Sequence, residues 1–171
     1  IEEQAIALSY NGFTHAVMMA TPTDLEDYAR GFSLTEGIVE RDDHWRLLAV
    51  ERHALGVVLE MGIAPARFYA LRERRRSLVG SSACGLCGSE SLAQVARPVR
   101  HVARECRTDV ATIAAAMAAL VEHQQMNRAS GGVHAAGYFA DGQILVREDA
   151  GRHNALDKLV GALQARETTA D

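Results

Sequence analysis

Two stretches of the chain alternate between apolar and polar side chains on either side of a short turn, the pattern of a β-hairpin. In residues 4–21 the turn is Asn11-Gly12, a dipeptide typical of the tight connection between paired strands. In residues 133–147 the turn is Asp141-Gly142. A third alternation, from His53 to Met61, predicts one further strand.

Apolar residues at helical spacing predict three helices. The first starts with Thr23 and Glu26, which are spaced as a capping box, and ends at Gly37. The second runs from about Asp109 to Gln125, and the third follows the polar residues 148–154. The apolar stripe of the first helix is Leu25, Tyr28, Ala29 and Phe32. That of the second is Val110, Ile113, Ala114, Met117, Leu120 and Val121, and that of the third is Leu156, Leu159, Val160 and Leu163. Strands and helices in this order predict a mixed fold, α/β or α+β.

A run of charged residues, Arg72 to Arg76, separates the two hairpin regions. It predicts a polar break in the chain, with a lobe boundary near residue 76. The expected units are an N-terminal α/β lobe, residues 1–76, and a core, residues 77–171.

Composition narrows the classes of protein to which the chain can belong. With 171 residues it is one domain, or one domain with a smaller lobe. A net charge of −4 and a pI near 6.0 argue against a dedicated nucleic-acid binder.

The most apolar stretch, Val110 to Val121, is too short to cross a bilayer, which takes about 20 residues. Residues 1–20 do not resemble a signal peptide, and three cysteines do not form a disulfide framework, so we expect a cytoplasmic protein without a membrane partner.

The segment Ser81-Ser82-Ala83-Cys84-Gly85-Leu86-Cys87-Gly88 places two thiols two residues apart among small residues. Three chemistries use thiols at this spacing: disulfide exchange, metal binding and sulfur transfer. Disulfide exchange of the thioredoxin type needs a strand-to-helix junction, and no helical pattern follows Gly88. A sulfur carrier needs only one exposed nucleophilic thiol. The spacing alone does not choose among these, and an incidental structural pair also stays open.

A zinc site needs four ligands, and the chain has a single CxxC pair. Cys106 and a histidine such as His134 or His153 would have to complete the site. Zinc deaminases carry H-x-E before P-C-x-x-C. Here His134 is followed by Ala135-Ala136, so the catalytic glutamate of a deaminase is missing. We therefore expect no bound metal.

Four segments, taken together and in order, resemble the FdhD family of sulfurtransferases required for formate dehydrogenase maturation. They are Gly31-Phe32-Ser33-Leu34-Thr35-Glu36-Gly37-Ile38, the SSACGLCG segment, Gly131-Gly132-Val133-His134-Ala135-Ala136, and Glu148-Asp149-Ala150-Gly151-Arg152-His153-Asn154-Ala155-Leu156-Asp157-Lys158. The last string is long and unusual enough to be specific by itself. The chain differs from the family's usual pattern at Ala83, where Ser is common, and at Ala150, where Val is common.

The resemblance implies a cytidine-deaminase-like core without deaminase activity. It also implies that Cys84 carries a persulfide received from a cysteine desulfurase, with Cys87 assisting. The sulfur would pass to the molybdenum bis-guanine-dinucleotide cofactor of formate dehydrogenase, which is bound as a substrate and not held permanently. The family further suggests a homodimer. Family members extend beyond the final helix, and a loop near their C-terminus is associated with binding the guanine dinucleotide.

Five further residues are candidate cofactor-binding residues: His134, Asp149, Arg152, His153 and Asn154. A helix N-terminus attracts anions, and the planar guanidinium of Arg152 suits a phosphate. The alternative is plain capping of the helix by Asp149 or Asn154, with Asp157 and Lys158 as surface charges. The Arg72–Arg76 run could likewise steer an anionic cofactor or dock an acidic face of the desulfurase, or simply be solvated.

Two other functions stay open at this point. The chain could be a chaperone that binds the cofactor or apo-formate dehydrogenase without using its cysteines, or it could be a small zinc-binding module.

Overall fold

The computed structural model describes residues 2–76 and 107–169, with side chains placed for 2–74 and 107–166. The predicted sulfur-carrying residues Cys84 and Cys87, together with Cys106, lie outside the described residues. The description below therefore concerns the sheets and helices on either side of that segment.

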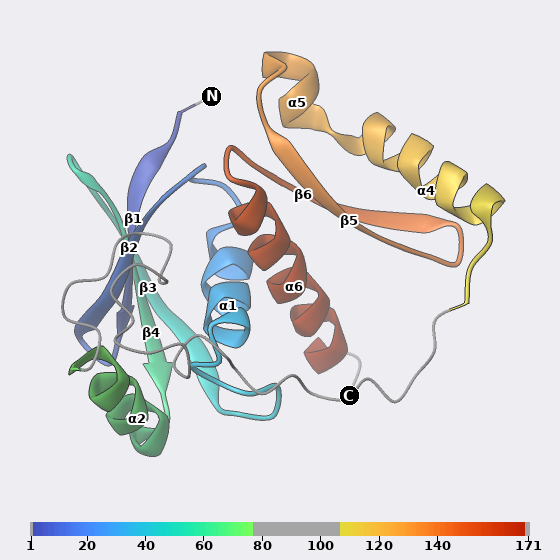
Figure 1. Ribbon diagram of the computed structural model, residues 1–171. Coiled ribbons are helices and arrows are strands. Elements are labelled where there is room, and N and C mark those ends of the chain that lie inside the picture. The colour runs from blue at the N-terminus through green and yellow to red at the C-terminus, as the bar shows by residue number, and fades with distance from the viewer. Residues whose placement is uncertain (1, 77–106, 170–171) are drawn as a thin grey trace.

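A four-stranded mixed sheet forms the N-terminal part (Figure 1). Its strands are β1 (Gln4–Tyr10), β2 (Phe13–Ala20), β3 (Trp45–His53) and β4 (Gly56–Ile63), in the order β2-β1-β4-β3. The pairs β1–β2 and β3–β4 are antiparallel hairpins, and β1 and β4 run parallel in the middle of the sheet. The first hairpin is confirmed, since both turn residues, Asn11 and Gly12, have positive φ (48° and 79°), as a tight hairpin turn requires.

The third predicted strand is confirmed as β4, although it begins at Gly56 and not at His53. Its hairpin partner β3 was not predicted. Its pairing with β4 shifts register at a bulge between Leu47 and Ala49, and the continuous apolar run Leu47-Leu48-Ala49-Val50 hides the alternation of a strand in the sequence.

Helix α1 (Leu25–Thr35) is confirmed, but its predicted capping box is wrong. Asp24 occupies the N-cap with a left-handed backbone (φ 50°) and makes no side-chain cap hydrogen bond. The Thr23 hydroxyl instead accepts a 3.4 Å hydrogen bond from the Lys158 ammonium. At the other end, Gly37 has φ 60° and its N–H bonds the Leu34 carbonyl, which ends the helix as predicted.

The prediction of a polar break at Arg72–Arg76 is wrong. These residues form the last turns of helix α2 (Pro65–Arg76). Proline suits the first helical position because its missing N–H would have no partner there. Phe68 and Leu71 share one face and pack on the core, and Leu71 is only 2% exposed, whereas Arg72, Glu73 and Arg74 are exposed.

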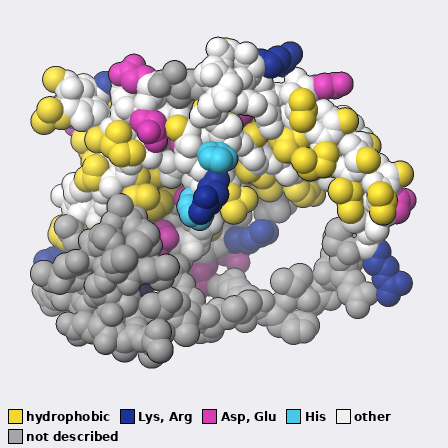
Figure 2. All heavy atoms as spheres, turned by 45° about the horizontal axis from the view of Figure 1, so that its top comes forward, with side chains coloured by type: hydrophobic (Ala, Val, Ile, Leu, Met, Phe, Trp, Pro, Cys, Tyr) yellow, Lys and Arg dark blue, Asp and Glu magenta, His cyan; other side chains and the backbone are white. Residues whose placement is uncertain are grey.

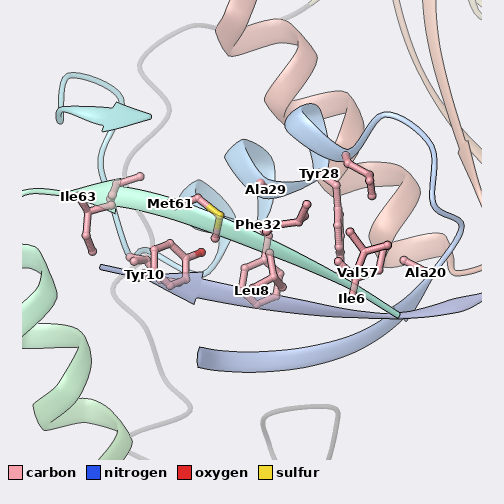
Figure 3. Close-up of a cluster of buried hydrophobic side chains, with 14 of the residues drawn as sticks. Ile6, Leu8, Tyr10, Ala20, Tyr28, Ala29, Phe32, Val57, Met61 and Ile63 are labelled. Carbon is pink, nitrogen blue, oxygen red and sulfur yellow. The ribbon is translucent and has the colours of Figure 1, made fainter. Parts of the chain in front are cut away.

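The main core lies between the first sheet and α1 (Figure 3). Alternate residues of β1 and β4 point into it, and α1 contributes Tyr28, Ala29 and Phe32. The residues of β1 and β4 that are at most 2% exposed are Ile6, Leu8, Tyr10, Val57, Leu59 and Met61. The Tyr10 hydroxyl is matched by the Ser33 hydroxyl at 2.8 Å, so the one polar group at this depth of β1 is hydrogen-bonded.

The second described part contains a two-stranded antiparallel sheet flanked by helices (Figure 1). Its elements are α4 (Val110–His123), α5 (Gln125–Ser130), β5 (His134–Ala140), β6 (Gln143–Asp149) and α6 (Arg152–Thr169). The second predicted hairpin is confirmed, with positive φ at Asp141 and Gly142. Helix α6 packs on one face of this hairpin, and α4 contacts the other.

Helix α4 begins where predicted, because the Asp109 carboxylate accepts the Thr112 N–H at 2.7 Å and caps it. Its apolar stripe, however, is not covered by the described residues. Val110 is 81% exposed, and Ile113, Met117 and Val121 are 52–63% exposed. Figure 2 shows hydrophobic side chains gathered over this part of the surface, at its upper right.

Helices α1 and α6 cross at two glycines. A Cβ built at Gly31 would collide with the backbone carbonyl of Asp157, and one at Gly161 would collide with the carbonyl of Asp27. Backbone therefore packs directly against backbone, which explains the glycine in the Gly31–Ile38 segment. Arg147 adds a 2.7 Å ion pair from β6 to Asp27 of α1. These contacts join the two parts of the chain that the predicted boundary near residue 76 separates, and that boundary itself stays a prediction.

Candidate functional site

Strand pairing brings the five predicted cofactor-binding residues to one place. His134 opens β5 and pairs in register with Asp149 at the end of β6, and Arg152, His153 and Asn154 form the first turn of α6 directly after it. We call His134 and residues 148–154 the β6–α6 corner. Residues 14 or more positions apart in the sequence are neighbours here because the hairpin folds back on itself.

Within this corner, Asp149 is a buried structural residue. It is 0% exposed and both of its carboxylate oxygens accept hydrogen bonds. Oδ1 accepts from the Gly151 N–H at 2.8 Å and from the Asn154 amide at 3.1 Å. Oδ2 accepts from the Thr21 N–H at 3.0 Å and forms a 2.7 Å ion pair with the Lys158 ammonium. Asp149 thus ties the start of α6 to the end of the first hairpin.

Asn154 belongs to the same buried network. Its amide also donates to the Met19 carbonyl at 2.8 Å, and its Oδ1 accepts a 3.2 Å hydrogen bond from the Tyr28 hydroxyl. Burial is the main cause that raises the pKa of Tyr28, with Asp157 and Asp149 adding to it, so this hydroxyl stays protonated and acts as a donor. For Asp149 and Asn154 the structure therefore favours the capping alternative over ligand contact.

Lys158, like Asp157 of the same motif, does not lie where the capping alternative placed it. That alternative makes Lys158 a surface charge, yet its side chain is 0% exposed. It is also the only lysine of the chain. Besides Asp149, its ammonium donates to the Thr21 carbonyl at 3.0 Å and to the Glu148 carbonyl at 3.4 Å. A compact ammonium can point its protons at several separate acceptors, which a planar guanidinium cannot do in the same space.

The signal that could have placed Lys158 is its spacing. Asn154 and Lys158 are four residues apart and therefore lie on one face of α6, next to the buried Ala155, Leu159 and Ala162. A lysine and an asparagine on a buried helix face need partners, and the motif supplies Asp149 a few residues earlier. We call Thr21, Tyr28, Asp149, Asn154 and Lys158 the Asp149 network.

The three remaining predicted residues, His134, Arg152 and His153, are exposed at the same corner. In the part of the chain that the structure describes, Arg152 forms no ion pair. The Ala155 N–H bonds the Gly151 carbonyl and so closes the first turn of α6. Figure 2 shows histidine and basic side chains grouped near the middle of the face that it displays. The corner can therefore offer a guanidinium and two imidazoles to an anion. The Asp149 network holds the N-terminus of α6, which carries Arg152 and His153, in place.

Asp157 lies one turn after His153, at the contact between α6 and α1. Burial is the largest effect and raises the pKa of Asp157 to about 6. The Thr35 hydroxyl, which donates to Oδ1 at 2.8 Å, and the nearby His153 act in the opposite direction, while Glu36 adds to the increase. Asp157 is half-buried and not the surface charge expected from the sequence.

Glu148 has a structural role as well. It is 8% exposed, and its carboxylate accepts the backbone N–H groups of Met126 and Asn127, both at 2.8 Å. These are among the first donors of α5, so Glu148 caps that helix from the neighbouring strand. Glu148 and Asp149 thus hold the corner together with the buried Lys158, while Arg152 and His153 are exposed.

Within residues 2–76 and 107–169, no group of three or more His, Cys, Asp or Glu side chains is arranged to hold a metal ion. In the same residues, no helix is both long and apolar enough to cross a membrane. The zinc alternative involving the cysteines lies outside the described residues.

Comparison with a solved structure supports the mixed fold. The crystal structure of a protein from Desulfotalea psychrophila, described as a formate dehydrogenase accessory protein, superposes with a TM-score of 0.61. The match covers 95% of this chain and 57% of that protein at 19% identity, which is evidence for the fold alone. The four-stranded mixed sheet and the hairpin thus belong to a known architecture.

Sequence comparison gives closer relatives. The sulfur carrier protein FdhD of Cupriavidus necator is 52% identical over 167 residues, which are 95% of this chain and 57% of that protein. The sulfur carrier protein FdhD of Xanthomonas campestris pv. campestris (strain B100) is 50% identical over 163 residues, 94% of this chain and 58% of that protein. The chain therefore spans a little over half the length of these relatives. The model of the FdhD/NarQ family matches residues 1–171, and with this match along its whole length the chain belongs to the FdhD/NarQ family.

Proposed function

We propose that the chain carries sulfur, as a persulfide on Cys84, to the molybdenum bis-guanine-dinucleotide cofactor of formate dehydrogenase. The observation that carries this proposal is family membership together with the Cys84–Cys87 pair in the SSACGLCG segment. Relatives at about half identity are named sulfur carrier proteins, and the protein with the similar fold is described as a formate dehydrogenase accessory protein.

Loading of Cys84 with sulfur from a donor persulfide needs no external oxidant or reductant. The Cys84 thiolate attacks the terminal sulfur of a persulfide on a cysteine desulfurase, and a new S–S bond forms at Cys84. The S–S bond of the donor breaks, and the cysteine of the donor leaves as a thiolate. Cys87 assists by holding or resolving the transferred sulfur. In the second step the S–S bond at Cys84 breaks, Cys84 leaves as a thiolate, and the sulfur takes an electron pair from the cofactor, which is a substrate of the protein.

The β6–α6 corner supports a role in binding that anionic substrate. His134, Arg152 and His153 are exposed, while the Asp149 network beneath them is buried and hydrogen-bonded. A rigid support lowers the entropy cost of ordering side chains around a ligand. We propose that Arg152 contacts a phosphate of the guanine dinucleotide and that the two histidines contact the same ligand. Asp149 and Asn154 position these residues and are not contacts.

Three further features remain part of the proposal. The donor is a cysteine desulfurase and the final acceptor is formate dehydrogenase, so the reaction takes place in the cytoplasm. The hairpin and its helices form part of a cytidine-deaminase-like core. The active form is a homodimer.

Mass spectrometry after incubation with a cysteine desulfurase and cysteine tests the sulfur-carrying step. We expect one added sulfur on the peptide that contains Cys84, removable by reductant and absent in Cys84→Ala. Cys106→Ala is the matched control and should still take up sulfur on Cys84. If an active desulfurase adds no sulfur to the wild type, the relay is wrong and the chaperone alternative is favoured.

Binding of guanosine diphosphate tests the corner separately. We expect Arg152→Gln to weaken binding about tenfold, since a bidentate guanidinium–phosphate contact is charge-assisted. Arg52→Gln, at another exposed arginine, on β3, is the control and should bind like the wild type. Equal affinity of Arg152→Gln and the wild type would exclude a phosphate contact at this corner.

A further inference from the structure

A partly exposed cluster of aromatic and arginine side chains lies at α2, at the end of the first sheet away from the β5–β6 hairpin (Figure 1). Its members are Phe68, Tyr69 and Arg72 of α2, and Phe13 at the start of β2. We call these four residues the α2 aromatic–arginine surface. The charged residues of α2 belong neither to the buried core nor to the β6–α6 corner.

The cluster is held together by ring contacts. The rings of Phe13 and Phe68 meet edge to face with centroids 6.3 Å apart, and Phe68 and Tyr69 are also 6.3 Å apart. The Arg72 guanidinium lies 5.8 Å from the Phe13 ring centroid and 5.9 Å from that of Phe68. Both distances are within the range of a cation–π contact, so Arg72 has a preferred position.

Both outer members of the cluster are open to solvent. Tyr69 is 66% exposed, and Arg72 is exposed as well. Within the described residues, Arg72 forms no ion pair, whereas Arg67 on the same helix is paired with Glu40 and Asp43. Arg72 thus presents an unneutralised positive charge beside a large exposed ring, on a chain whose net charge is −4.

A few residues contribute most of the binding energy of a protein–protein interface, and tryptophan, tyrosine and arginine are enriched among them. A tyrosine has few rotatable bonds, and an arginine already placed over two rings loses little further freedom on binding. The arrangement therefore suits docking of a folded partner whose contact surface carries carboxylates around an apolar depression.

Chain connectivity places this surface near the proposed sulfur-carrying residue. Helix α2 ends at Arg76, eight residues before Cys84. Eight residues span at most about 29 Å, so Cys84 lies within that distance of the end of α2. A standard interface covers roughly 800 Å² on each partner, a patch about 30 Å wide. A partner docked on α2 can therefore reach Cys84 with its own catalytic residue.

We propose that the α2 aromatic–arginine surface docks the protein that donates the persulfide, with carboxylates of the donor facing Arg72 and Tyr69 inserted beside them. This proposal rests on the proposed function, because it assigns the donor side of the same transfer. An anionic small molecule at Arg72 is a different occupant and is one outcome of the test.

The test measures single-turnover loading of Cys84 with sulfur at increasing concentrations of a persulfide-loaded cysteine desulfurase. The variants are Arg72→Glu and Tyr69→Ala, and the matched control is Arg52→Glu, the same charge change on β3. We expect the half-saturating donor concentration to rise at least about tenfold in both variants, with the rate at saturation unchanged. The control should stay within about twofold of the wild type.

A small-molecule persulfide, such as cysteine persulfide, provides the second arm because it needs no docking surface. We expect it to load the wild type, Arg72→Glu and Tyr69→Ala equally. If the wild type takes sulfur from neither donor, the proposed function fails. If it takes sulfur from both, the proposed function stands and the docking proposal is judged by the variants alone.

Three results would overturn the docking proposal. The first is an unchanged half-saturating concentration in both variants. The second is an equal rise of the half-saturating donor concentration in Arg52→Glu, which would mean that the net charge of the chain, and not this surface, governs association with the donor. The third is unchanged loading from the desulfurase together with weaker guanosine diphosphate binding by Arg72→Glu, which would assign the surface to a small anionic ligand.

Discussion

Replacing Lys158 should destabilise the protein strongly, even when the positive charge is kept. In Lys158→Met the carboxylate of Asp149 stays buried without its counter-ion. Breaking a buried ion pair in this way costs about 3–5 kcal/mol. Asp149 keeps three N–H donors, from Thr21, Gly151 and Asn154, so we expect the lower end, about 3 kcal/mol.

This loss is large for a chain of 171 residues. Domains of such size are stable by about 5–15 kcal/mol, and each kcal/mol shifts the melting temperature by about 2–4 °C. We therefore expect Lys158→Met to melt roughly 6–12 °C lower. Lys158→Arg should lose at least about 1 kcal/mol, since the guanidinium is bulkier and cannot reach the Thr21 and Glu148 carbonyls with the same geometry.

Urea denaturation measures these changes, with Arg52→Met on β3 as the exposed control, expected within about 0.5 kcal/mol of the wild type. The double variant Asp149→Asn/Lys158→Met should be destabilised less than the sum of its two single variants, by about 1–3 kcal/mol. Because Lys158 is the only lysine, acylation of its amine also reports opening of this region, and the wild type should react there only after unfolding. Rapid acylation of native protein, a loss below 1 kcal/mol in Lys158→Met, or strict additivity in the double variant would refute a buried, paired ammonium.

Two other predictions follow from the contact between α1 and α6. Because burial raises the pKa of Asp157 to about 6 from 3.8, its ionisation costs the folded state stability as pH rises from about 4 to 6. Asp157→Asn, which keeps an acceptor for Thr35, should therefore gain about 2 kcal/mol at pH 8, after allowance for partial exposure, and almost nothing at pH 4; the same gain at both pH values in urea titrations would contradict this. Gly31→Ala should lower stability by more than about 3 kcal/mol because its Cβ meets the Asp157 backbone, whereas Gly142→Ala has free space and should lose only about 1 kcal/mol from its positive φ, as differential scanning calorimetry can show.

Elements whose conformation is set by adjacent residues were predicted correctly from short sequence patterns. The Asn11-Gly12 and Asp141-Gly142 turns have φ values that favour these residue types, so both hairpins were predictable. Gly37 likewise marked the end of α1. The capping box failed because the Thr23 hydroxyl is engaged by Lys158, a residue 135 positions away that no local pattern can include.

Charge is ambiguous in a sequence because the same residues can be solvated or buried. The charged run Arg72–Arg76 predicts a break, yet it continues helix α2, because Phe68 and Leu71 of the same helix pack against the core. Lys158 was interpreted as a surface charge, yet it is fully buried because Asp149 and two carbonyls neutralise and solvate it.

Signals in the amino-acid sequence were enough to predict both hairpins, the three main helices, the resemblance to a family and the list of candidate site residues. These depend on turn chemistry, helical periodicity and motif order, which are all local or linear properties. Tertiary structure alone decided that β1 and β4 are parallel neighbours, that α1 and α6 cross at Gly31 and Gly161, and that the five corner residues separate into a buried support and an exposed basic surface. Those outcomes depend on contacts between segments more than 40 residues apart, where desolvation and backbone fit, and not residue type, decide which groups are buried.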